Sequence, residues 1–279
     1  MSGTEQNKIL ISEDFYSIQG EGMTTGAPSY FIRLANCNLT CGATPKFVNK
    51  FKTDERDDTP GSFQGDLELE GKATWTCDSI PEWAKGTHQP YEYLFERWTD
   101  QDILADIASG VIHIIWTGGE PTIPMHQRAI VGFMEYFEAY CYACDLPFTP
   151  YCEIETNGTV PITSELAIYI DQINCSPKLS NSGMSISKRI RPHALDSIRS
   201  HPKYQFKFVV SDETDIKEMF ETFINPFSIP ITNVCCMPGM DSREHFHERT
   251  KWVMEMGMKY KFIALSRMHI SAWDQTTGV

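Results

Sequence analysis

The stretch Val111-Ile-His-Ile-Ile-Trp-Thr-Gly-Gly-Glu-Pro121 decides the fold class. Its apolar first half predicts a buried strand, Val111–Thr117, and its two glycines predict a tight turn. The pattern of the following residues, Pro124–Cys144, predicts a helix. Strand and helix patterns continue to alternate along the chain. This alternation predicts an α/β fold with parallel strands, in a barrel or partial barrel, whose functional groups gather at the carboxyl ends of the strands.

The remaining elements follow from the same patterns. Seven further strands are predicted: Lys8–Ile18, Tyr30–Ala35, Tyr151–Thr156, Gln172–Cys175, Tyr204–Val210, Asn233–Met237 and Lys259–Leu265. Further helices are predicted at Thr99–Ala108, Ser164–Tyr169, Lys188–Ser200, Ser211–Phe223 and Asp241–Met256, the last with Asp241 as N-cap and Gly257 as stop signal. Residues Gly42–Thr74 have little apolar periodicity, so an inserted surface loop is expected there within a single domain, 1–279.

The composition predicts a globular cytoplasmic protein. Of the 279 residues, 41% are hydrophobic and 22% are charged, and the formal net charge is −13. A negative balance repels a phosphate backbone, which argues against nucleic acid as a partner. No apolar run approaches the ~18 residues of a membrane span, and the N-terminus lacks the apolar stretch of a signal peptide. In a reducing compartment, the nine cysteines are expected to be metal ligands or buried residues.

Three cysteines have a spacing that suggests a metal centre. Cys37 and Cys41 directly follow the predicted strand Tyr30–Ala35, and Cys77 follows the predicted insertion. Three thiolates can hold a [4Fe–4S] cluster at three irons and leave the fourth open to a substrate. On spacing alone, two buried cysteines plus an incidental one, or half of a zinc site, explain the pattern equally well.

The other cysteines have the positions of packing residues. Cys141 and Cys144 continue the apolar face of a predicted helix, although their spacing is also compatible with zinc. The remaining four lie in predicted strands: Cys152, Cys175, Cys235 and Cys236.

Polar side chains follow several predicted strands. Glu120 lies in the glycine-rich turn, where its carboxylate can accept hydrogen bonds from an ammonium group. Glu153 and Glu155 lie on the same side of their strand, because side chains alternate along a strand. The segment Asn174–Lys178 ends the next strand. These groups predict a shared pocket, whereas ordinary polar turns are the alternative.

A further polar group precedes the cysteines. Gln19 and Glu21 lie among glycines, and Arg33 lies in the strand that leads to Cys37. An arginine in this position can bind a planar carboxylate through two hydrogen bonds. A turn with a surface ion pair is the alternative interpretation.

Taken together, these motifs resemble a known family. Cys37, Cys41 and Cys77 with Gly118-Gly-Glu-Pro121 resemble a radical S-adenosylmethionine (SAM) enzyme. The 7-carboxy-7-deazaguanine synthase family is similar over most of the chain, in the segments Tyr16-Ser-Ile-Gln-Gly-Glu-Gly22, Arg33-Leu-Ala-Asn-Cys-Asn-Leu39, Cys77-Asp-Ser79, Glu155-Thr-Asn-Gly-Thr159, Ser176-Pro-Lys178 and Arg267-Met-His269. The chain departs from the compact CxxxCxxC motif of that family, because residues 42–76 form an insertion within the cluster-binding loop and Thr74 stands where the middle cysteine is expected.

The resemblance implies a fold and a reaction. It implies a partial β6/α3 barrel of TIM-like type, a homodimer, and an electron donor such as flavodoxin. It implies that 6-carboxy-5,6,7,8-tetrahydropterin becomes 7-carboxy-7-deazaguanine with loss of ammonia. A [4Fe–4S] cluster would cleave SAM to a 5′-deoxyadenosyl radical, which removes hydrogen from C6 of the pterin before the ring contracts. Mg²⁺ is expected with the hydroxyl of Ser79 as a ligand.

The resemblance also assigns residues. Those expected at the pterin are Ile18, Gln19, Gly20, Glu21, Arg33 and Thr117. Those expected at SAM are Thr76, Cys77, Asp78, Gly119, Glu120, Ser176, Pro177, Lys178, Met237, Pro238, Gly239 and Met240. A separate expectation comes from the residues of the C-terminal tail. The tail is expected to fold over the pterin, with His269 at the end of the last strand and the Val279 carboxylate both in contact with it; the alternative is that His269 only packs and the tail is disordered.

Two other functions fit parts of this pattern. A radical SAM activase would share the cysteines and the glycine-rich turn but would not explain Gln19, Glu21 and Arg33. A zinc-stabilised binding module without catalysis would be colourless, whereas a [4Fe–4S] protein is brown.

Overall fold

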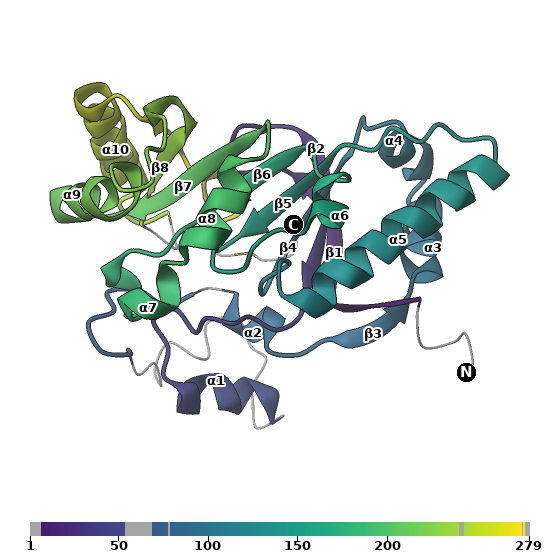
Figure 1. Ribbon diagram of the computed structural model, residues 1–279, viewed down its shortest axis with the longest axis horizontal. Coiled ribbons are helices and arrows are strands. Elements are labelled where there is room, and N and C mark those ends of the chain that lie inside the picture. Colours follow the sequence, from purple (N-terminus) through teal and green to yellow (C-terminus); the bar gives the residue numbers. More distant parts are fainter. Residues whose placement is uncertain (1–6, 54–68, 78, 240–242, 275, 277–279) are drawn as a thin grey trace.

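A nine-stranded sheet forms the centre of the computed structural model, which describes residues 7–53, 69–77, 79–239, 243–274 and 276 (Figure 1). The strand order is β3-β1-β2-β4-β5-β6-β7-β8-β9. The strands are β1 (Lys8–Ile18), β2 (Pro28–Leu34), β3 (Thr87–Pro90), β4 (His113–Gly118), β5 (Cys152–Thr156), β6 (Gln172–Cys175), β7 (Tyr204–Val210), β8 (Val234–Pro238) and β9 (Ile263–Ala264).

The sheet is parallel from β2 to β9, and β1 runs antiparallel to both β2 and β3. Its edge strands, β3 and β9, do not pair with each other, so the sheet is open. The predicted α/β class is therefore confirmed, and the parallel arrangement brings the carboxyl ends of seven strands to one edge.

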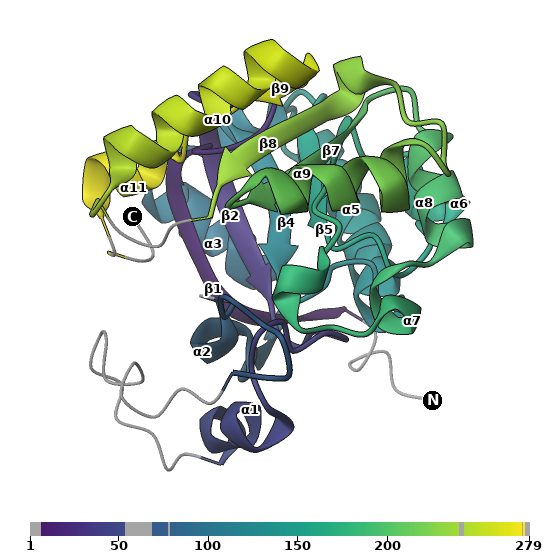
Figure 2. The ribbon, with the colours of Figure 1, turned by 90° about the vertical axis from the view of Figure 1, so that its left-hand side faces the viewer.

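The helices of the described chain are α1 (Pro45–Lys52), α2 (Ile80–Trp83), α3 (Glu92–Asp100), α4 (Leu104–Ala108), α5 (Pro124–Ala143), α6 (Ser164–Ala167), α7 (Ile186–Arg189), α8 (Pro192–Arg199), α9 (Glu213–Met219), α10 (Phe246–Tyr260) and α11 (Met268–Trp273). Short helical turns are η2 (Ser180–Ser182), η3 (Phe220–Ile224) and η4 (Ile231–Asn233). Figure 2 shows α5, α8, α9 and α10 around the outside of the sheet. In the described residues, none of these helices has the length and apolar character needed to cross a bilayer.

The main hydrophobic core lies between the sheet and its outer helices. Trp98 of α3 and Phe133 of α5 pack edge to face with ring centroids 5.8 Å apart, and Trp116 of β4 meets the same phenylalanine at 5.6 Å. Ile154 of β5 and Phe206 of β7 belong to this core. The residues beside them in the strands, such as Glu155 and Lys207, therefore point to the opposite face, as strand alternation requires.

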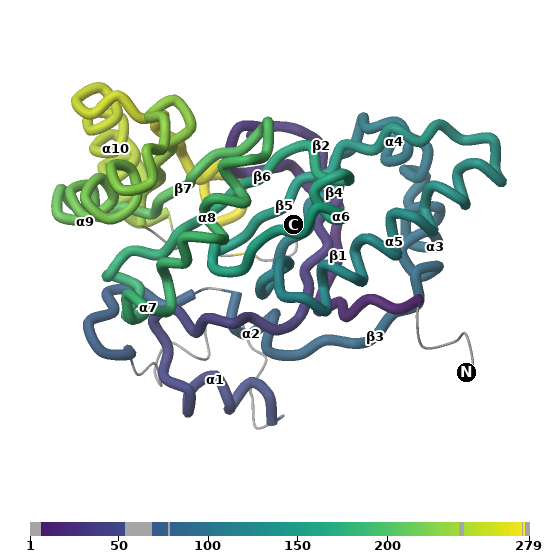
Figure 3. Tube along the Cα trace, viewed as in Figure 1, coloured from purple at the N-terminus to yellow at the C-terminus, as the bar shows by residue number. Residues whose placement is uncertain are grey.

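Several predicted boundaries are wrong, each for a local reason. The predicted loop Gly42–Thr74 contains α1, whose first turn is capped by Thr44 and whose Phe47, Val48 and Phe51 are buried. This apolar face covers only two turns and alternates with lysines, so it is too short to produce a detectable helical periodicity in the sequence. Figure 3 shows α1 lying apart from the sheet.

The predicted helix Thr99–Ala108 is in fact the end of α3 followed by α4. The chain turns between them at Asp102, whose φ of 58° is left-handed. The strand β3 and most of α3 were not predicted at all, because only three residues of α3, Leu94, Phe95 and Trp98, face the core.

The last helix runs past its predicted stop. Gly257 lies inside α10, where an added Cβ would approach the Ala264 Cβ to 3.0 Å, so this glycine permits close packing against β9. The helix ends instead at Tyr260, before Lys261 with a φ of 70°. The predicted strand Lys259–Leu265 is therefore reduced to β9, and the proposed N-cap Asp241 lies outside the described residues.

Candidate active site

The glycine-rich turn after β4 holds the loop that carries Cys37. Gly119 N donates to Leu34 O at 2.8 Å, and Glu120 N donates to Asn36 O at 2.9 Å. A Cβ added at Gly119 would lie 1.7 Å from Asn36 O. The two backbones thus meet at a distance that only glycine allows.

The structure brings the three predicted cluster ligands together across the insertion. Cys77 N donates to Cys41 O at 3.0 Å. Cys37 and Cys77 both pack against the buried group formed by Leu39, Cys41 and Met184. Burial raises the pKa values of the Cys37 and Cys41 thiols, and the Glu120 carboxylate adds to the effect at both.

The chemistry of this donor set is that of an iron–sulfur cluster site. Among the described residues, no three or more His, Cys, Asp or Glu side chains are placed to hold one metal ion. A cluster takes each thiolate on a different iron, so its three ligands need not converge on a point. The grouped thiols of Cys37, Cys41 and Cys77 are compatible with a [4Fe–4S] cluster.

The carboxylate of Glu21 forms two ion pairs in the site. It lies in the turn between β1 and β2, where Lys207 Nζ is 2.6 Å from Oε2 and Arg267 Nε is 3.0 Å from Oε1. Burial alone would raise the pKa of this carboxyl, but Lys207, Arg267 and His269 together lower it far below its ordinary value. Burial likewise lowers the pKa of Lys207, but Glu21 and Glu155 raise it above its usual range. Both partners are therefore charged at neutral pH.

Glu155 connects this ion pair to two predicted substrate residues. Thr117 Oγ1 donates to Glu155 Oε2 at 2.7 Å, and Gln19 Nε2 lies 3.5 Å from Oε1. Lys207 Nζ is 3.9 Å from the same Oε1. Residues of β4, β5, β7 and the first turn thus meet on the polar face of the sheet.

His269 reaches this group by an unexpected route. It was predicted to follow a strand directly, but it lies in α11. Met268 N donates to Gly20 O at 3.2 Å, and a Cβ at Gly20 would lie 2.6 Å from His269 Nδ1. His269 Nε2 is 3.9 Å from Glu21 Oε1. His269 therefore lies beside Gly20 and Glu21. Its contact with the pterin stays a prediction, and Val279 lies outside the described residues.

Arg33 and Ser79 connect the polar group to the cysteine loop. Arg33 Nε pairs with Glu13 Oε1 at 2.6 Å, and its NH1 donates to Ser79 Oγ at 3.4 Å. Ser79 follows Cys77 by two positions, with Asp78 outside the described residues between them. The guanidinium thus stands beside the segment that carries the third cysteine.

Glu120 is enclosed by protein. It accepts from Thr122 N at 3.0 Å, Thr122 Oγ1 at 2.5 Å, Thr156 Oγ1 at 2.7 Å and Asn157 N at 2.7 Å, and it has no exposed surface. Burial raises the pKa of its carboxyl, and these hydrogen bonds oppose the rise. In this geometry Glu120 joins the turn after β4 to the turn after β5, and its contact with SAM stays a prediction.

The other predicted SAM residues lie at the same edge of the sheet. Ser176 N donates to Thr156 O at 2.7 Å, and Lys178 Nζ donates to Ser176 Oγ at 3.1 Å. Gly239 follows β8 and donates to Val210 O at 3.0 Å. Pro177, Met237 and Pro238 belong to the segments just described, and Met240 lies outside the described residues. Ile18, a predicted pterin residue, ends β1 and pairs with Pro28, so it lies beside the amino end of β2. Within the described part of the chain, the buried Thr76 hydroxyl has no hydrogen-bond partner.

The structure also shows residues that the sequence analysis left without a role. Lys207 and Arg267 neutralise Glu21. Thr24 Oγ1 donates at 2.9 Å to Glu153, which was predicted in the shared pocket and also accepts from Asn174 Nδ2 at 2.8 Å. The available signal was strand alternation, because Lys207 lies between Phe206 and Phe208 in a predicted strand and so faces away from the core.

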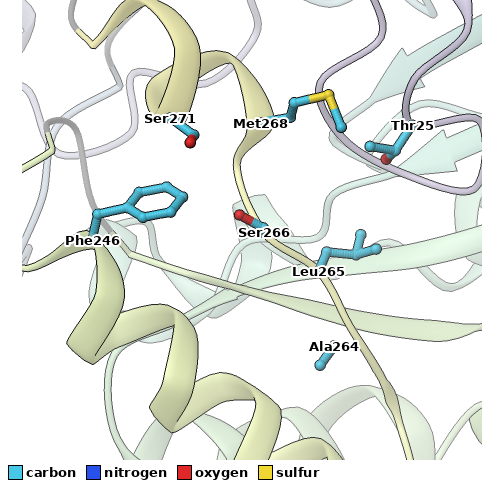
Figure 4. Close-up of a pocket in the computed structure, with 7 residues that line it drawn as sticks. All are labelled: Thr25, Phe246, Ala264, Leu265, Ser266, Met268 and Ser271. Carbon is cyan, nitrogen blue, oxygen red and sulfur yellow. The ribbon is translucent and has the colours of Figure 1, made fainter.

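A surface cavity of about 290 Å³ lies beside α11. Its lining residues are Thr25, Phe246, Ala264, Leu265, Ser266, Met268 and Ser271, which Figure 4 shows as sticks. None of these was predicted as a site residue, and the cysteines are not among them.

A glycine-rich turn held against a three-cysteine loop, at the carboxyl edge of a parallel sheet, defines the class of radical SAM enzymes. No family model matches the chain. It is 30% identical to 7-carboxy-7-deazaguanine synthase of Pyrobaculum aerophilum, with 100% of both chains covered. It is 25% identical to that of Halobacterium salinarum, with 98% of this chain and 93% of the other covered. The chain therefore belongs to the 7-carboxy-7-deazaguanine synthase family.

A solved structure supports the fold. The crystal structure of QueE from Escherichia coli aligns with a TM-score of 0.56 at 22% identity, over 94% of this chain and 95% of the other. Membership of the family makes this chain a radical SAM enzyme of 7-deazaguanine biosynthesis, which implies SAM and an iron–sulfur cluster.

Proposed function

We propose that the chain converts 6-carboxy-5,6,7,8-tetrahydropterin to 7-carboxy-7-deazaguanine, with release of ammonia, on the polar face of the sheet. Family membership over the whole chain supports the reaction. The observation that carries the assignment to this site is the convergence of Gln19, Glu21 and Thr117 with Glu155 and Lys207. An activase would need the cysteine loop but has no evident use for this group.

The polar group has the chemistry of a pterin site. An amino-pterin presents several N–H donors, and the ionised Glu21 carboxylate is a strong acceptor for them. Arg33 carries a planar guanidinium that matches the substrate carboxylate. Thr117, Gln19 and the backbone around Gly20 supply neutral hydrogen-bonding groups. Because these groups are held by protein contacts before any ligand arrives, they orient the pterin with little rearrangement.

The cysteine loop has the chemistry of the radical centre. A [4Fe–4S] cluster on Cys37, Cys41 and Cys77 would supply the electron that cleaves SAM and so yields the radical that removes hydrogen from the pterin. Thr76, Asp78, Gly119, Glu120, the segment 176–178 and the segment 237–240 are proposed to bind or orient SAM. The Ser79 hydroxyl is proposed as a Mg²⁺ ligand, since a hard cation prefers oxygen donors.

The remaining expectations belong to the same proposal. We expect the six parallel strands from β2 to β8 to act as a partial β6/α3 barrel and residues 1–279 to form one domain with the insertion at 42–76. A homodimer, a cytoplasmic location and an electron donor such as flavodoxin are expected from the family resemblance. The Val279 carboxylate is proposed to contact the pterin with His269.

The reaction can be tested with the Glu21→Gln variant. We expect a brown protein with normal SAM binding and a large loss of pterin turnover, because the amide no longer neutralises Lys207 and Arg267. Iron content and the SAM dissociation constant are measured beside product formation. Normal turnover in this variant would remove Glu21 from the pterin site.

A further inference from the structure

The insertion docks on the loop that follows β6. Gly42 N, at its start, donates to Ser182 O at 2.8 Å. Thr74 N, at its end, donates to Asn181 O at 2.9 Å. The two arms also bond to each other, since Glu70 N donates to Gly42 O at 3.0 Å. Both ends of the insertion are therefore fixed to the segment immediately after Lys178.

Trp75 adds side-chain contacts to this junction. Its indole Nε1 donates to Asn181 Oδ1 at 3.0 Å, and Lys178 Nζ lies 5.9 Å from the ring centroid. An ammonium group at this distance is attracted by the face of an indole ring. The same ammonium donates to Ser176 Oγ at 3.1 Å. Lys178 is thus held between Ser176 and Trp75, with a donor remaining for a ligand.

The backbone of this loop is fixed from its other side. Arg189 NH1 donates to Lys178 O at 3.2 Å, and Glu218 accepts from Ser180 N at 3.0 Å. Arg189 and Glu218 also pair with each other at 2.8 Å. Since α7 and α9 already hold the backbone, a change at Trp75 should move the Lys178 side chain more than the loop.

We propose that Trp75 is a positioning residue that aims the Lys178 ammonium into the SAM site. Through Trp75, the insertion sets the affinity of the site for SAM. This inference rests on the proposed role of Lys178 in SAM binding. Because Trp75 precedes Cys77 by two positions, one short segment serves both the cysteine loop and the SAM loop. Trp75 belongs to the arm of the insertion that returns to Cys77, so the coupling would connect this arm to Lys178.

The test is a double-mutant cycle on equilibrium SAM binding. The reconstituted, oxidised holoenzyme is dialysed against SAM without pterin, for wild type, Trp75→Leu, Lys178→Met and the double variant. We expect Trp75→Leu to weaken SAM binding about five- to tenfold, and to have no further effect once Lys178 is Met. The KM for the pterin should stay within about twofold, and iron and sulfide content should match the wild type.

A second variant tests whether the effect of Trp75→Leu arises only from a disturbance of the nearby Cys77. Asn181→Leu removes the partner of the indole from a position remote from the cysteines in sequence, and it should weaken SAM binding about two- to fourfold, again only while Lys178 is present. Phe47→Leu, in the buried face of α1, is the matched control and should leave SAM affinity unchanged.

Three results would overturn the inference. The first is full SAM affinity in Trp75→Leu, and the second is an equal loss with and without Lys178. A loss in Phe47→Leu as large as in Trp75→Leu would also contradict it, because general loosening of the insertion would then explain the effect. Unchanged SAM affinity in Lys178→Met would instead remove Lys178 from the SAM site, and the inference with it.

Discussion

Substitution of Gly119 by alanine should disable the enzyme through the cysteine loop. The added Cβ would lie 1.7 Å from Asn36 O, 2.3 Å from its carbonyl carbon and 3.0 Å from Cys37 N. Ordinary contacts between such atoms begin above about 3 Å, so the two backbones must separate by more than ~1 Å. Gly119 is hydrogen-bonded to Leu34 O at the end of β2, whereas Asn36 lies in the loop beyond that strand, so the displacement falls on the segment that carries Cys37. A misplacement of ~1 Å in a reacting group can lower turnover about 10²-fold.

The assay measures iron and sulfide per chain after anaerobic reconstitution and then the turnover number at saturating pterin and SAM. Gly71→Ala is the matched control, because its φ of 56° gives strain of about 1 kcal/mol while no atom of the described residues lies within 4 Å of the added Cβ. We expect the control to keep its cluster and its turnover. Wild-type iron content together with turnover within about threefold in Gly119→Ala would refute the reasoning.

Three other predictions concern the charged and metal-binding residues. Alanine at any of the proposed ligands, Cys37, Cys41 or Cys77, should abolish cluster absorbance and turnover, whereas Cys144→Ala should retain both; a full cluster without Cys41 would contradict the assignment across the insertion. Ser79→Ala should weaken the Mg²⁺ dependence of turnover and leave the cluster intact, so an unchanged Mg²⁺ titration would exclude this ligand. Glu21→Gln should lower the free energy of unfolding at pH 7 by about 3 kcal/mol. The folded pKa of Glu21 lies far below its unfolded value of about 4.5. The stability difference between wild type and variant should therefore be constant above pH 5 and shrink by about 1.4 kcal/mol per pH unit as the pH falls below 4.5. Denaturant titrations that show a constant difference down to pH 3.5 would contradict the ion pair.

Sequence periodicity predicted the parallel strands well because their apolar faces are continuous. The bounds of β6 and β7 match the predicted segments, as do those of the antiparallel β1, and the alternation of Glu153 and Glu155 around Ile154 is confirmed. Periodicity failed where the buried face is short, as in α1, or where a glycine has a packing role, as Gly257 does in α10. Local patterns carry no information about such long-range contacts.

The same limit applies to the site. Motifs identified the cysteines, the glycine-rich turn and Gln19 to Glu21, because each is a compact segment. The partners of Glu21 are Lys207 and Arg267, which lie far away in the sequence and meet it only through the order of the strands. The enclosure of Glu120 could not be predicted from the sequence either, since its hydrogen-bond donors come from the ends of two neighbouring strands.

The central claim is most directly tested by one incubation. The reconstituted protein is mixed under anaerobic conditions with 6-carboxy-5,6,7,8-tetrahydropterin, SAM, Mg²⁺ and a chemical reductant, and the products are followed by mass spectrometry. We predict 7-carboxy-7-deazaguanine and one equivalent of ammonia per pterin consumed. A brown, fully loaded protein that cleaves SAM but leaves the pterin unchanged would contradict the account.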